Sequence, residues 1–153
     1  MLFFGVYFIQ KKLFQIQKNR PINHKDNSSP DILSEKIESE LMQKIKEFEE
    51  SKHYLDKNMS LPTLISLLNT NTTYLRSFIK KHKNTDYNNY INELRIQYIK
   101  EKLTTDKDYL NYKISYLANE CGFRSHSKFS TNFKKFTGLC PSEFITDIRN
   151  KSI

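Results

Sequence analysis

The feature that most constrains this chain is a glycine between two short amphipathic segments near its C-terminus. Apolar residues recur at helical spacing before the glycine, at Ile114, Leu117, Ala118 and Cys121. Gly122 can then take the left-handed conformation that ends a helix. Ser125 can cap a second helix, whose apolar face holds Phe129, Phe133 and Phe136. The stretch 114–137 therefore predicts two short helices joined by a tight turn.

Small polar and basic residues occupy the opposite face of the second helix: His126, Ser127, Lys128, Ser130, Thr131 and Lys134. Two short helices with this turn and this outer face are typical of a helix-turn-helix unit. In such a unit the second helix enters the major groove of DNA. Double-stranded DNA is therefore the expected partner.

The same stretch resembles the signature of AraC/XylS-type transcriptional regulators. The matching positions are Leu117-Ala118, Gly122-Phe123, Ser125, Phe129, Phe133-Lys134-Lys135, Gly138, Pro141-Ser142 and Phe144. The resemblance implies a DNA-binding domain with two helix-turn-helix units, and it implies a structural role for Arg95. The sequence departs from the family pattern at Cys140, where the family usually has a threonine that caps the next helix better.

A first copy of the unit lies 53 or 54 residues upstream. Leu64, Ile65 and Leu68 take the places of Leu117, Ala118 and Cys121, and Lys80-Lys81 takes the place of Lys134-Lys135. Asn69 replaces Gly122, and asparagine is the residue after glycine that best tolerates the left-handed conformation. Asn71 replaces Ser125 as the helix cap. An internal repeat of this length predicts that one supersecondary unit is used twice.

The predicted fold class is all-α, with two helix-turn-helix subdomains joined by a long linker helix. About seven helices are expected, plus a short apolar helix at the N-terminus. Within a DNA-binding domain at 34–149, the expected bounds are about 60–82 for the first unit, 86–103 for the linker helix and about 113–137 for the second unit. The helix expected at Ser34–Tyr54 has an acidic outer face, so it either packs on the first repeat or contacts a partner. The chain after Ile148 is expected to fray.

Residues 1–18 are apolar at first and then basic. The apolar run Met1–Ile9 is too short to span a bilayer, which takes about 20 apolar residues. The lysines after it resemble the cytoplasmic end of a membrane helix, and the segment fits equally well a short amphipathic helix that docks on the chain itself or on a partner. The family resemblance bears on this choice, because some AraC-type relatives are membrane-anchored sensors that end in such a domain. Residues 19–33 are expected to form a linker.

The net charge of +8 is unevenly distributed along the chain. Residues 31–57 carry a net charge of −3, whereas residues 60–104 and 111–153 carry +4 each. Positive charge on both repeats favours contact with phosphates. The two cysteines and four histidines lack the spacing of a disulfide framework or a metal site. Because the sequence also lacks a catalytic constellation, we expect no enzyme activity, no cofactor and no metal.

The outer faces of the two recognition helices supply the candidate site residues. Those predicted to read bases are Thr72, Thr73, Arg76, Ser77, His126, Ser127, Lys128 and Thr131. Those predicted to contact phosphates are Lys80, Lys81, Arg124, Lys134 and Lys135. Arg76 is the strongest candidate, because its guanidinium can pair with both O6 and N7 of guanine.

These features predict a sequence-specific transcription regulator that inserts two recognition helices into successive major grooves of promoter DNA. RNA polymerase is the expected second partner. The nucleoid in the cytoplasm is the expected location, with residues 1–12 as a candidate membrane tether. Two alternatives stay open: a helical adaptor that binds protein through the apolar N-terminus and the acidic helix, and the cytoplasmic output domain of a membrane-anchored sensor.

Overall fold

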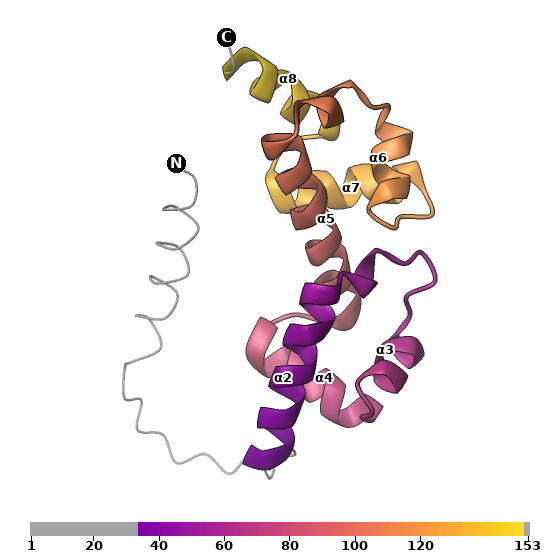
Figure 1. Cartoon of the computed structure of the whole chain (residues 1–153), viewed down its shortest axis with the longest axis vertical. Coiled ribbons are helices and arrows are strands. Elements are labelled where there is room, and N and C mark those ends of the chain that lie inside the picture. Colours follow the sequence, from indigo (N-terminus) through magenta and orange to yellow (C-terminus); the bar gives the residue numbers. More distant parts are fainter. Residues whose placement is uncertain (1–33, 152–153) are drawn as a thin grey trace, which may run out of the picture. The chain divides into compact units, whose positions relative to one another are not determined.

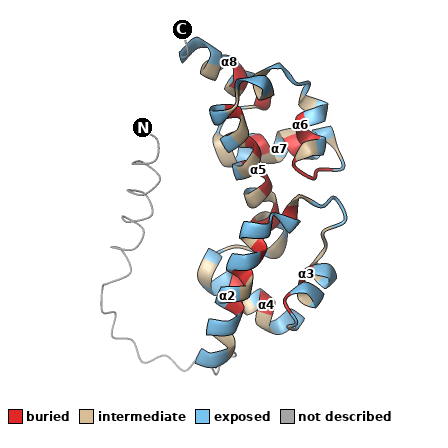
Figure 2. Ribbon diagram, viewed as in Figure 1, coloured by how far each residue is buried: buried red, intermediate tan, exposed pale blue. Residues whose placement is uncertain are grey.

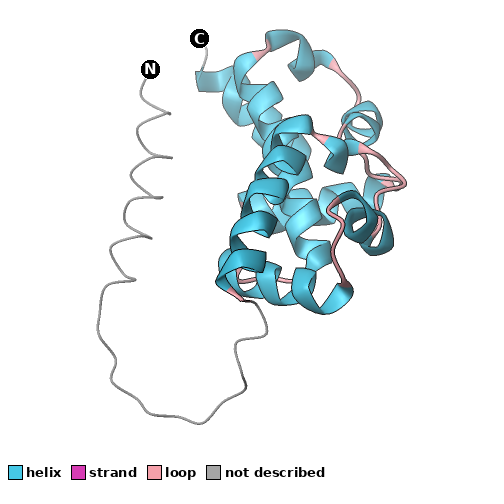
Figure 3. Cartoon of the chain, turned by 60° about the horizontal axis from the view of Figure 1, so that its bottom comes forward, coloured by secondary structure: helices cyan, strands magenta, loops and turns pink. Residues whose placement is uncertain are grey.

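Seven α-helices and two short 3-10 helices make up the computed structural model, which describes residues 34–151 and contains no strand in that range (Figure 3). The α-helices are α2 Glu35–Ser51, α3 Leu61–Leu67, α4 Thr72–Lys83, α5 Tyr87–Thr105, α6 Ile114–Glu120, α7 His126–Thr137 and α8 Pro141–Lys151. The 3-10 helices are η1 His53–Leu55 and η2 Lys107–Asn111. The all-α prediction is confirmed. The apolar helix and most of the linker predicted for residues 1–33 lie outside the described residues.

The two predicted helix-turn-helix units are present and have matching dimensions. The first helix of each, α3 or α6, has 7 residues, and the second, α4 or α7, has 12. Asn69 and Gly122 both take left-handed backbone conformations in the turn, with φ of 46° and 82°. The backbone N–H after each donates across the turn, from Thr70 to Ile65 at 3.1 Å and from Phe123 to Ala118 at 2.9 Å. These equivalent bonds, 53 residues apart, confirm the internal repeat.

Side-chain caps fix where five of the described α-helices begin. The capping residues are Ser34 for α2, Ser60 for α3, Asn71 for α4, Asp86 for α5 and Ser125 for α7, and each side-chain oxygen accepts a bond from a backbone N–H three residues on. A cap of this kind is worth about 1 kcal/mol, because it satisfies a donor that has no partner within the helix. The caps at Asn71 and Ser125 are as predicted above.

Helix α5 takes part in two separate hydrophobic cores (Figure 2). Its first half contributes Tyr90 and Ile91 to a core with α2, α3 and α4. Its second half contributes Ile96 and Ile99 to a core with α6, α7 and α8. Figure 1 shows α5 running between these two groups of helices. Its 19 residues give a rod of about 28 Å, so it links the subdomains as predicted.

The acidic helix α2 packs on the first repeat. Its apolar stripe, Leu41, Ile45 and Phe48, is buried in the first core. The first of the two arrangements expected for this helix is therefore the one observed. Helix α2 ends at Ser51 because Lys52 takes a left-handed conformation with φ of 58°, and the chain then turns so that Tyr54 is buried. The predicted end at Tyr54 is corrected accordingly.

The C-terminal helix extends further than expected. Fraying was predicted after Ile148, but α8 continues to Lys151. The guanidinium of Arg149 donates to the backbone oxygen of Leu110 at 2.6 Å. The ammonium of Lys151 lies 2.7 Å from the carboxylate of Asp147, one turn earlier. These polar contacts hold the last turn, and neither is visible in the apolar periodicity on which the prediction depended.

Candidate nucleic-acid interface

Burial of one face of α4 turns the predicted reading face outward. Leu75, Phe78 and Ile79 are fully buried in the first core. On the opposite face the predicted base-reading residues Thr72, Thr73 and Arg76 are exposed, and Ser77 is half-buried. The side chain of Arg76 has no hydrogen bond or ion pair among the described residues, so its guanidinium is available to a ligand.

In helix α7 the buried phenylalanines likewise leave the opposite, polar face exposed to solvent. Phe129 and Phe133 are fully buried, whereas Phe136 is half-buried. The four residues predicted to read bases from this helix are all exposed: His126, Ser127, Lys128 and Thr131. The two units therefore present equivalent polar faces.

In each Lys-Lys pair, the first lysine points into solvent and the second contacts a neighbouring helix. Lys80 and Lys134, which are equivalent in the repeat, are exposed and form no ion pair among the described residues. Lys81 lies 2.8 Å from the carboxylate of Glu38 on α2, and the ammonium of Lys135 donates to the side-chain oxygen of Asn89 on α5 at 2.6 Å. Successive residues of an α-helix point about 100° apart, so only one lysine of each pair points away from the neighbouring helix.

Carboxylates of α2 hold the C-terminal turn of α4. Glu38 contacts His82 as well as Lys81, and Glu49 lies 2.7 Å from the ammonium of Lys83. The hydrogen bond from Lys81 holds the pKa of Glu38 below its ordinary value. These pairs neutralise the side of α4 that faces α2, so the positive charge of α4 is concentrated on its other side.

A groove of about 600 Å³ runs beside the exposed face of α4. Arg76 and Lys80, one helical turn apart, form part of its wall, together with the first residues of α3 and α5. Asp86 also lines the groove, and the backbone N–H of Asn89 lowers the pKa of its carboxyl group. The groove thus places two cations along one edge of the first unit.

Arg124, which the sequence predicts to contact phosphate, forms hydrogen bonds within the protein. Its Nε donates to the backbone oxygen of Lys57 at 3.0 Å, and a terminal nitrogen donates to the side-chain oxygen of Asn58 at 2.6 Å. Both acceptors lie in the segment between η1 and α3, more than 60 residues earlier. Sequence analysis missed Lys57 and Asn58, because no periodicity links this loop to α7.

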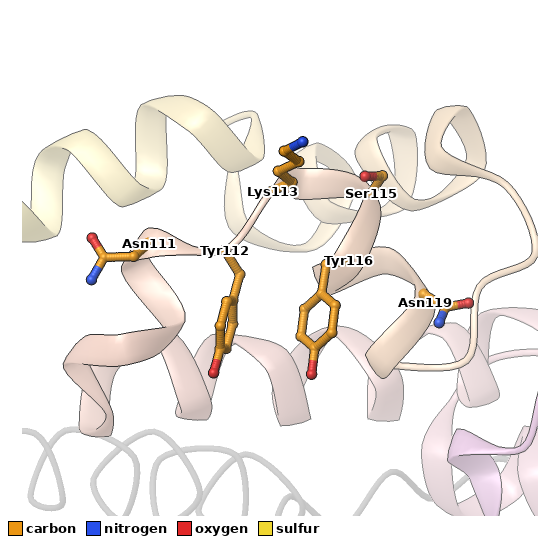
Figure 4. A pocket seen from close by; sticks show the side chains of 6 residues that line it. All are labelled: Asn111, Tyr112, Lys113, Ser115, Tyr116 and Asn119. Carbon is orange, nitrogen blue, oxygen red and sulfur yellow. The ribbon is translucent and has the colours of Figure 1, made fainter.

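A second hollow, of about 500 Å³, lies beside α6 (Figure 4). Figure 4 shows the side chains of Tyr112 and Tyr116 next to each other, and their ring centroids are 4.6 Å apart. The other lining residues are Asn111, Lys113, Ser115 and Asn119. None of these six residues is a carboxylate, histidine or cysteine.

The described residues contain no cluster of three or more histidines, cysteines or carboxylates that could hold a metal ion. Cys121 is fully buried, and burial raises the pKa of its thiol to about 12. The thiol is therefore neutral at ordinary pH, and Cys121 is buried with the apolar residues among which the sequence places it. None of the described helices is long and apolar enough to cross a membrane.

Residues 64–147 match the family model of a helix-turn-helix domain. The match covers more than half of the chain and includes both recognition helices and α5. The chain therefore belongs to the AraC-type helix-turn-helix family of DNA-binding domains.

Individual relatives agree with this assignment. The raffinose operon transcriptional regulatory protein RafR of Pediococcus pentosaceus is 30% identical over 95 residues, which are 60% of this chain and 33% of RafR. The solved C-terminal domain of the response regulator yesN from Fusobacterium nucleatum is 25% identical, with a TM-score of 0.58 over 68% of this chain and 96% of that domain. The DNA-binding domain of AdpA, solved with a target DNA, shares the fold at 20% identity, with a TM-score of 0.60 over 72% of this chain and 94% of that domain.

The chain spans about a third of the length of RafR. Its match to each of the other curated relatives likewise covers between 21% and 37% of their length. The similarity between this chain and these relatives is therefore limited to the part of each relative that corresponds to the helix-turn-helix domain.

Proposed function

We propose that this chain is a sequence-specific transcription regulator that places α4 and α7 in successive major grooves of promoter DNA. The observation that carries the proposal is the duplicated helix-turn-helix unit, with both polar faces exposed and both units attached to α5. The linker helix is about 28 Å long, and each recognition helix adds its own width to the distance between the two units. The separation of α4 and α7 is therefore comparable with the distance between successive major grooves on one face of DNA, about 34 Å.

The proposed roles follow from the placement of the side chains. Base reading falls to Thr72, Thr73, Arg76 and Ser77 on α4, and to His126, Ser127, Lys128 and Thr131 on α7. Phosphate contact falls mainly to Lys80 and Lys134, because the lysine after each is held by a neighbouring helix. Such contacts set affinity and register but carry no sequence information.

The remaining predictions follow from this role. A regulator of transcription binds DNA that RNA polymerase also binds, so we retain RNA polymerase as the proposed protein partner and the nucleoid as the proposed location. The chemistry proposed is binding alone, with no catalytic step. A membrane tether through residues 1–12 lies outside the described residues and stays a prediction.

Replacing both Lys80 and Lys134 with alanine should weaken binding to all duplexes alike. Each lysine that leaves a phosphate lowers the slope of log affinity against log salt by about one, so the double variant should lose about two units of slope. Titration of a labelled duplex at several salt concentrations measures this. The double variant Lys46→Ala/Lys107→Ala is a matched control, because both lysines are exposed but neither lies on a recognition helix.

Two outcomes of the same titration would contradict the proposal. Equal slopes for the Lys80/Lys134 variant and its control would mean that these lysines do not face phosphate. Binding of the unchanged protein that does not weaken as salt rises would favour a protein-binding adaptor instead.

A further inference from the structure

The segment that precedes the first helix-turn-helix unit lies on the turn of the second. We call residues 54–58 the bridge segment. Arg124, just before α7, donates to the backbone oxygen of Lys57 and to the side chain of Asn58. The ammonium of Lys57 in turn donates to the side-chain oxygen of Asn119 in α6. Polar contacts thus join the second unit to the segment that leads into α3, in addition to the covalent link through α5.

A buried arginine of α5 forms hydrogen bonds with the backbone of the bridge segment. Arg95 of α5 is 8% exposed. Its guanidinium donates to the backbone oxygens of Tyr54 and Asp56, each at 2.7 Å. The guanidinium carbon also lies 5.6 Å from the ring centroid of Phe123, in the turn of the second unit. Arg95 therefore contacts the linker helix, the bridge segment and the second turn together.

The turn itself is shaped to accept the bridge segment. A Cβ atom on Gly122 would lie 2.3 Å from the backbone oxygen of Leu55, closer than any side chain permits. Asn69 has the same place and the same left-handed conformation in the first unit, but it is exposed. The close approach of a backbone thus explains why the second unit has glycine where the first has asparagine.

Helix α7 is also held near its other end. The bond from Lys135 to Asn89 ties the last turns of α7 to the first turn of α5, which follows α4 directly. Helix α7 is thus bonded to α5 near its last turn, and the residue just before its cap, Arg124, is bonded to the bridge segment.

We propose that the bridge segment sets the spacing between the two half-sites that this protein recognises, with Arg124 acting as a positioning residue. The inference rests on the proposed function, since half-site spacing has meaning only if both units bind DNA. Because the bridge segment fixes the separation and relative rotation of α4 and α7, a duplex whose half-sites are one base pair too close or too far presents its grooves at the wrong angle.

The test compares Arg124→Ala and Asn58→Ala with the unchanged protein on duplexes whose half-sites are moved by one or two base pairs. We expect the affinity ratio between the preferred and the neighbouring spacings to fall by about fivefold in both variants. The base preference within each half-site should stay the same. Asn58→Ala removes one acceptor of Arg124 but keeps the positive charge at position 124. A loss of spacing preference in both variants is therefore due to the contact between these two residues and not to the charge. If Arg124→Ala fails to fold, Asn58→Ala alone tests the proposal.

Other outcomes overturn the proposal. If Arg124→Ala weakens every spacing equally and lowers the salt slope by about one while Asn58→Ala changes nothing, Arg124 is a phosphate contact. If both variants keep the spacing preference of the unchanged protein, the bridge segment does not set it, although the proposed function stands. If the unchanged protein binds no duplex specifically, the proposed function and this inference both fail.

Discussion

Replacing Phe133 with alanine is expected to lower the free energy of unfolding by about 3–5 kcal/mol, as truncation of a buried aromatic side chain does. The ring of Phe133 is fully buried in the second core. Its centroid lies 5.5 Å from that of Phe129 and 5.3 Å from that of Phe144, so α7 and α8 both lose contacts when it is removed. Chemical denaturation followed by circular dichroism measures the change.

Tyr116→Ala is the matched control for this measurement. Tyr116 is an aromatic residue of the same subdomain, but it is 46% exposed. Its removal should change the free energy of unfolding by only about 0.5 kcal/mol. A loss below about 1 kcal/mol for Phe133→Ala would mean that the phenylalanine face of α7 is not the buried one. The assignment of the opposite face to DNA would then be wrong as well.

Arg76→Ala is expected to relax base preference at one or two base pairs by about 1–3 kcal/mol, which is roughly fivefold to 150-fold in affinity. Arg76 lies on the exposed face of α4, beside the groove that it shares with Lys80. It is the only arginine in either recognition helix, and a guanidinium can pair with two acceptors of one guanine where a lysine cannot. Selection of sites from random duplexes, followed by affinity measurements on single-base variants, gives the size of the effect.

Arg76→Lys separates charge from geometry in that experiment. It keeps the positive charge but loses the planar fork, so nonspecific affinity should be retained while the base preference is lost. A selected motif that is the same for Arg76→Ala and the unchanged protein would contradict the assignment. A motif altered only by changes in α7 would make α7 the main reader.

The parts of the fold that could be predicted are those that depend on neighbours in sequence. Asn69 and Gly122 mark the two turns because few residues tolerate the left-handed conformation. Ser60 and Asp86 mark helix starts because their side chains reach a backbone N–H three residues away. The phase of each recognition helix follows from its apolar face, so the outward direction of residues such as Arg76 could be predicted too.

Contacts between distant residues could not be predicted. The pairing of Glu38 with Lys81 joins positions 43 residues apart, and that of Lys135 with Asn89 joins positions 46 apart. Apolar periodicity shows which face of a helix is buried, but not which residue of another helix lies opposite a given lysine. For the same reason the bonds of Arg124 to the bridge segment could not be predicted, and its contact with phosphate stays a prediction.

Footprinting with dimethyl sulfate on a selected duplex would show directly whether both recognition helices bind DNA. The reagent methylates guanine N7, which is exposed in the major groove where α4 and α7 are proposed to lie. We expect two protected clusters of guanines on one face of the duplex, about 10 base pairs apart, with Arg76→Ala losing protection in one cluster only. A single protected cluster, or two clusters that both disappear with Arg76→Ala, would contradict binding by two separate recognition helices.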